Sequence, residues 1–136
     1  MTTNLAAYAA TLALFLIADM AWLGTMVNRV YRPALGDILI EGVNLPPAIV
    51  FYLLYPIGVV IFAVMPALKG GTIYTALAHG ALFGFFTYAT YDLSNQATLR
   101  GWPLHVTIID IAWGTALGAM AASVGFFAAA KVQSLT

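Results

Sequence analysis

The chain has 136 residues, of which 62% are hydrophobic and only 7% charged, and its formal net charge is zero. A water-soluble domain carries about 25% charged residues, so this composition excludes a soluble enzyme, a nucleic-acid-binding protein and a disordered regulator. Cysteine is absent, which also excludes disulfides and thiolate metal sites. With a mean hydropathy of +0.94, the chain is expected to form one integral membrane domain over residues 1–136.

Four apolar stretches are each long enough to cross a bilayer, which takes about 20 residues. They cover residues 4–28, 46–68, 72–96 and 103–131. The first is not expected to be a cleaved signal peptide, because it lacks a basic beginning and a small-residue cleavage site and is too long. Short turns at Lys69 and Arg100 join the last three stretches. The sequence therefore predicts an all-α, four-transmembrane-helix antiparallel bundle.

The connection between the first two stretches is the longest and the most charged. Over residues 33–41, Leu35, Ile38 and Leu39 would share one side of a helix, and Asp37 and Glu41 the other. Such a pattern is typical of a short amphipathic helix in the membrane interface. An ordinary connecting loop is the alternative.

Three acidic residues fall inside the predicted spans, where a charged side chain costs about 2.5–3.5 kcal/mol. They are Asp19, Asp92 and Asp110, and each comes from a different helix. At ~1.5 Å per residue, each lies ~10–14 Å below the same membrane face. Scattered acids would not be expected to agree in depth, so we interpret them as one intramembrane site for ligand binding or proton relay.

Aromatic and polar residues accompany the acids on their helix faces. Trp22 and Trp113 each follow an acid in an Asp-x-Ala-Trp motif, one on the first helix and one on the antiparallel fourth. Side by side, these helices would bring Asp19 near the level of Trp113. The residues expected to line or close the site are Trp22, Trp113, Tyr88, Tyr91 and Asn95, and Tyr52 and Tyr55 could add hydroxyls. Acids that merely hold the bundle together through polar pairs are the alternative.

Two further patterns concern packing and metals. Gly80-x-x-x-Gly84 and Gly114-x-x-x-Gly118 are small-residue motifs that let helices approach closely. They are expected to pack the third and fourth helices together, with a homodimer contact as the alternative. His79 and His105 lie near opposite membrane faces and are better read as interface residues than as haem ligands. We expect no metal and no cofactor.

Several longer runs resemble a known family. Phe51 to Gly58 reads FYLLYPIG, Tyr88 to Pro103 reads YATYDLSNQATLRGWP, and Asp110 to Thr115 reads DIAWGT. Together they resemble the bacterial membrane family catalogued as domain of unknown function 2177. The resemblance implies four helices, a place in the cytoplasmic (inner) membrane and cytoplasmic termini. The charges of this chain barely decide its orientation, since two lysines lie on the side of the termini and three arginines on the opposite side.

The sequence leaves the activity open and does not decide whether the protein is an enzyme. An acidic, aromatic-lined pocket fits a lipid or another mainly apolar molecule with one polar group. One alternative is a small proton-coupled transporter or channel, which would need a dimer. Another is an accessory subunit of a larger membrane complex. A nucleic-acid partner is not expected.

Overall fold

The computed structural model describes residues 1–136, and every regular element in it is helical. The order is α1 (Thr2–Met26), a π-helical turn η1 (Val27–Tyr31), α2 (Arg32–Leu35), a 3₁₀ turn η2 (Gly36–Ile38), α3 (Leu45–Val59), a second π-helical turn η3 (Val60–Val64), α4 (Met65–Leu68), α5 (Ile73–Thr98) and α6 (Leu104–Leu135). Because the short elements continue their neighbours without a break, the chain forms four helical rods. The predicted all-α bundle is confirmed.

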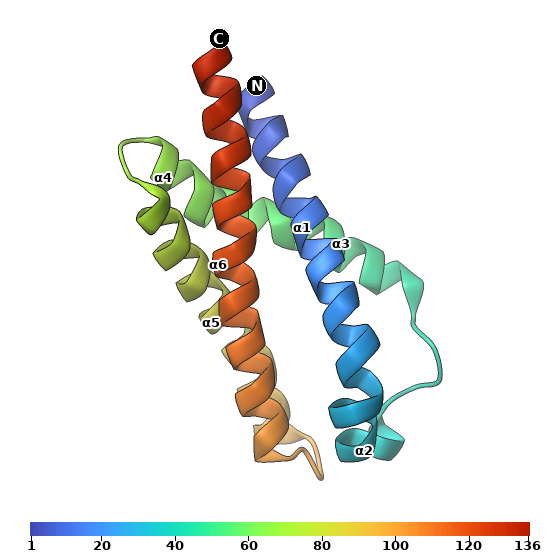
Figure 1. Ribbon diagram of the computed structural model, residues 1–136. Helices are drawn as coiled ribbons and strands as arrows, with labels where there is room; N and C mark the ends of the chain where they lie inside the picture. The colour runs from blue at the N-terminus through green and yellow to red at the C-terminus, as the bar shows by residue number, and fades with distance from the viewer.

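Three of the rods are long and apolar enough to cross a membrane: Thr2–Ile38, Leu45–Leu68 and Leu104–Leu135. The fourth, α5, has 26 residues but is more polar, since it carries Asp92 and a run of serine, asparagine, glutamine and threonine near its end. Figure 1 shows α5 beside α6, and the N- and C-termini together at one end of the molecule. We call this the termini end, and the opposite end, which holds α2 and the turn between α5 and α6, the α2 end.

The first rod is longer than its sequence suggests. The predicted end near Asn28 lies inside η1. Of the short helix expected over residues 33–41, the structure has the end of α2, which stops at Leu35 where Gly36 takes a φ of 45°, and then a 3₁₀ turn to Ile38. Pro33 cannot pair with the carbonyl four residues earlier, at Arg29, and its ring would clash there in a regular helix. That carbonyl lies within the wider π-helical turn, and the helix therefore passes the proline without ending.

Glycines hold α5 and α6 together along their length. A side chain added at Gly80 would strike the Gly118 backbone, and one added at Gly84 would strike the Gly114 backbone. No residue larger than glycine fits at these crossings without separating the helices. The structure thus places all four motif glycines at the α5–α6 interface within one chain.

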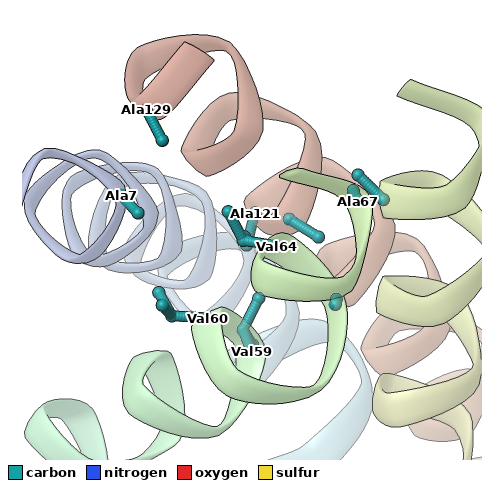
Figure 2. Packing of buried hydrophobic residues seen from close by; sticks show 10 residues of the cluster. Ala7, Val59, Val60, Val64, Ala67, Ala121 and Ala129 are labelled. Atoms are coloured by element: carbon teal, nitrogen blue, oxygen red, sulfur yellow. The ribbon is translucent and has the colours of Figure 1, made fainter. Parts of the chain in front are cut away.

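Helix α6 is central, because it packs along both α5 and α1, whereas α1 and α5 have few contacts with each other. At the termini end, the space between them is closed by alanine and valine side chains from α1, α3, η3, α4, α5 and α6 (Figure 2). Toward the α2 end the buried cluster is smaller, comprising Tyr31, Leu35 and Val106. This difference in packing leaves room for a site in the α2 half of the molecule.

Candidate ligand-binding site

Two adjoining cavities lie in the α2 half of the bundle. The aromatic cavity has a volume of about 420 Å³ and is lined mainly by rings from α1, α3, α5 and α6. The loop-side cavity has a volume of about 460 Å³ and is lined by α1, η1, α2, α5, α6, the α5–α6 turn and the segment between η2 and α3. Leu23, Tyr91 and Asp110 line both cavities, so the two form neighbouring lobes of one site.

Asp19 lies in the aromatic cavity and is 6% exposed. The Tyr52 hydroxyl donates to its Oδ2 at 2.5 Å, and the Trp113 indole N–H donates to its Oδ1 at 3.1 Å. Each carboxylate oxygen therefore has one donor, from α3 and from α6. Asp19 ties three helices together and is satisfied without a ligand.

The two Asp-x-Ala-Trp motifs meet across the α1–α6 contact. Trp22 and Trp113 stack with their ring centroids 4.4 Å apart and their planes 5° from parallel. Trp113 bonds the acid of the other motif directly, whereas Trp22 donates at 3.0 Å to the Tyr31 hydroxyl, which donates at 2.7 Å to Asp110 Oδ1. The antiparallel relation expected from the repeated motif is present, with one tyrosine inserted on one side.

Asp92 differs from both other acids. It is 0% exposed, and neither carboxylate oxygen has a hydrogen-bond partner. Its carboxyl group lies within hydrogen-bonding reach of Asp110, but two ionised carboxylates have no proton to donate. A shared proton or a ligand donor is therefore needed to satisfy Asp92, which lines the loop-side cavity.

Most of the residues expected from the sequence surround these two cavities. Trp22, Trp113, Tyr88 and Tyr91 line the aromatic cavity, although Tyr91 is 57% exposed overall. Asn95 lines neither cavity and instead neighbours the Tyr91 side chain. The three acids line the two lobes, with Asp110 common to both. Their role in ligand binding or proton relay stays a prediction.

Tyr31 and Arg32 are two cavity residues that the sequence reading missed. In a regular α-helix of 3.6 residues per turn, Tyr31 would lie about 180° around the axis from Trp22. The π-helical turn η1 advances less per residue, so Tyr31 reaches the side of Trp22 and bonds it. Proline at position 33 was the one available signal, because it marks a local departure from regular helix.

His79 has a structural partner outside the site. Its Nδ1 lies 3.2 Å from the Phe62 carbonyl oxygen. That carbonyl is four residues before Pro66, which cannot donate to it, and it lies within η3. The histidine therefore lies against a carbonyl that Pro66 cannot bond. Nowhere do three or more histidine, cysteine or acidic side chains come together to hold a metal ion.

Residues 4–127 match a family described as a predicted membrane protein, DUF2177. The chain belongs to this family. The DUF2177 match covers both Asp-x-Ala-Trp motifs and Asp92, and so includes every residue of the two cavities. No curated protein and no solved structure matches the chain. Membership in DUF2177 thus agrees with an integral membrane protein and assigns no activity.

Proposed function

We propose that the protein binds a lipid or another mainly apolar molecule, with the polar group of that molecule directed at Asp92 and Asp110. The observation that carries the proposal is the unpartnered Asp92 carboxyl group, fully buried in the wall of a cavity that contains Asp110. Burying a polar group without a partner is costly, and a ligand donor would satisfy the Asp92 oxygens where the chain supplies only a proton shared with Asp110.

The shape and lining of the cavities support an amphiphilic guest. Ligand sites are concave, mainly apolar and supplied with a few convergent polar groups, and both lobes fit this description. Eight of the 11 residues around the aromatic cavity are hydrophobic, as are 10 of the 14 around the loop-side cavity. A chain of apolar atoms would occupy the aromatic cavity while its polar end met the acids.

The depth of the site supports a ligand drawn from the bilayer. With α5 crossing the membrane beside α6, the acids lie ~10–14 Å below the face marked by Arg29 and Arg100. Intramembrane carboxylates are expensive and mark functional sites by default. A soluble ligand would have to leave water to reach this depth, whereas a lipid is already there.

Native mass spectrometry of protein purified in mild detergent tests this proposal. We expect a retained amphiphile, displaced by dodecylamine more readily than by dodecanol, because only the amine can pair with the acids as a cation. Leu23→Trp, which adds bulk at one of the three residues that line both cavities, should abolish retention. Leu16→Trp, on an exposed position of the same helix, should not. Equal retention by both variants would refute the proposal.

A proton-coupled carrier is the second candidate. It is favoured by one observation, the continuous run of side chains from Trp22 through Tyr31 and Asp110 to Asp92. Hydrogen-bonded acids can pass a proton along such a run. Proteoliposomes loaded with a pH-sensitive dye would acidify in response to a proton gradient, and Asp92→Asn would remove this response. An unresponsive wild-type protein would exclude the carrier.

A further inference from the structure

The loop-side cavity contains a cation as well as two acids. Asp92 and Asp110 contribute from α5 and α6, and Arg32 contributes from the start of α2. Asp92 is completely buried, whereas Arg32 is exposed. The cavity is therefore negative at its deep end and positive at its mouth.

The two ends are separated by a short distance that the chain itself fixes. Tyr31 reaches from η1 to Asp110, and Arg32 is the next residue along the chain. Since neighbouring Cα atoms lie about 3.8 Å apart, the base of the Arg32 side chain lies no further from Asp110 than one Cα step, the Tyr31 side chain and its hydrogen bond together span. Arg32 bonds neither acid within the chain, so the gap between the charges is available to a guest of head-group size.

We infer that the ligand is a zwitterionic amphiphile, with a primary ammonium group at Asp92 and Asp110 and an oxyanion at Arg32. This inference rests on the ligand binding proposed above and names the class of ligand. An ammonium group offers three donors, which suits the two unpartnered oxygens of Asp92 and the free oxygen of Asp110. A guanidinium group binds phosphate or carboxylate oxygens in a bidentate manner.

The same charges select against simpler ligands. A purely anionic lipid would satisfy Arg32 and place its charge near two acids, and a purely cationic one would leave Arg32 without a counter-ion. Discrimination that uses repulsion as well as attraction is a general route to specificity. The site also lies toward the α2 end, near the membrane face at which lipid head groups reside, so a phospholipid could enter it head group first.

The test compares four probes by native mass spectrometry in mild detergent. Three carry the same dioleoyl chains: phosphatidylethanolamine is zwitterionic, phosphatidylglycerol is anionic and a trimethylammonium-propane lipid is cationic. The fourth, phosphoethanolamine, is the soluble head group alone. We expect the wild-type protein to retain phosphatidylethanolamine at least about tenfold more than the other two lipids. Stronger binding of phosphoethanolamine than of the lipid would place the source of the ligand in solution.

Two pairs of variants complete the test. Arg32→Gln should reduce phosphatidylethanolamine retention to the level of the cationic lipid, and Asp92→Asn should remove the preference for phosphatidylethanolamine over phosphatidylglycerol. The matched controls are Arg29→Gln and Asp37→Asn, which remove one positive and one negative charge at the same end of the molecule. Neither residue lines a cavity, and both variants should bind as the wild type does. Equal retention of the cationic and zwitterionic lipids, unaffected by Arg32→Gln, would overturn this inference and leave the proposed function standing. Retention of no lipid by the wild type would overturn both.

Discussion

Asp19 and Asp92 are both buried, but their surroundings differ in a way that predicts opposite responses to the same substitution. Asp19 receives one hydrogen bond at each oxygen, from Tyr52 and from Trp113. Asp92 receives none. Two acids that look equivalent in the sequence therefore differ in what the fold requires of them.

Asp19→Asn should lower the stability of the protein, and Asp92→Asn should not. An asparagine at position 19 can accept from Trp113 only with its carbonyl oxygen, because the indole can only donate, and its NH₂ group must then donate to the Tyr52 hydroxyl in place of the short bond from that hydroxyl to the carboxyl group. The loss should be about 1 kcal/mol, within the range for polar contacts between membrane helices. At position 92, a neutral amide replaces a carboxyl group without a partner. Thermal unfolding in detergent measures both, and a larger loss from Asp92→Asn would contradict the assignment.

The hydroxyl of Tyr52 should account for part of the stability that Asp19 provides. Tyr52→Phe removes the donor to Asp19 and keeps the ring, so we expect a loss of about 1 kcal/mol. Tyr74→Phe is the matched control, because Tyr74 is 77% exposed at the other end of the bundle. Equal unfolding temperatures for the two variants would show that the short Tyr52–Asp19 bond contributes nothing.

Among the elements, the α5–α6 pair is held by backbone contact, and a single added methyl group tests this. Gly84→Ala places a carbon against the Gly114 carbonyl oxygen, which cannot move without separating the helices. We expect a loss of about 1–3 kcal/mol, as for overpacked interiors. Gly24→Ala on α1, where nothing lies within 4 Å of the added atom, should be neutral or slightly stabilising. Similar melting curves for the two would argue against the glycine contact.

In the rod α3–η3–α4, the Phe62 carbonyl, which Pro66 cannot bond, is met by the His79 side chain from α5. His79→Ala should destabilise the native protein by about 1 kcal/mol, since it exposes the Phe62 carbonyl within the membrane. In a Pro66→Ala background the backbone N–H of residue 66 becomes available to that carbonyl, and the same change should cost less. A double-mutant cycle on unfolding free energies measures the difference. Additive effects would mean that His79 and Pro66 act independently.

At the scale of the whole molecule, both termini lie at one end (Figure 1). Because the chain has no cysteine, single cysteines can be introduced without a background. Thr3→Cys and Ser134→Cys should react with an impermeant maleimide from the same face of sealed vesicles, and Gly101→Cys from the opposite face. Labelling of the two termini from different faces would mean that α5 does not cross the membrane.

The helical bundle was predictable because its signals are repetitive: long apolar stretches, and glycines four residues apart. The meeting of Asp19 with Trp113 was also predictable, since two copies of one motif on antiparallel helices must face each other in reverse. The position of Tyr31 could not be predicted. A single wider turn rotates every residue after it about the helix axis, and the spacing of apolar residues does not reveal such a turn. The lack of a hydrogen-bond partner at Asp92 could not be predicted either, since it depends on which side chains from other helices are too far away to bond it.

The uneven packing of the two halves also has a mechanical consequence. Closely packed interiors hardly yield to compression, and every member of the alanine–valine cluster at the termini end is buried. The α2 half contains cavities of about 420 and 460 Å³, which can shrink when the surrounding chains press inward. Changes in lateral tension or thickness of the leaflet around the α2 end would therefore deform mainly the half of the molecule that holds the acids. We expect the affinity for an occupant to vary with the acyl composition of that leaflet and hardly at all with that of the other.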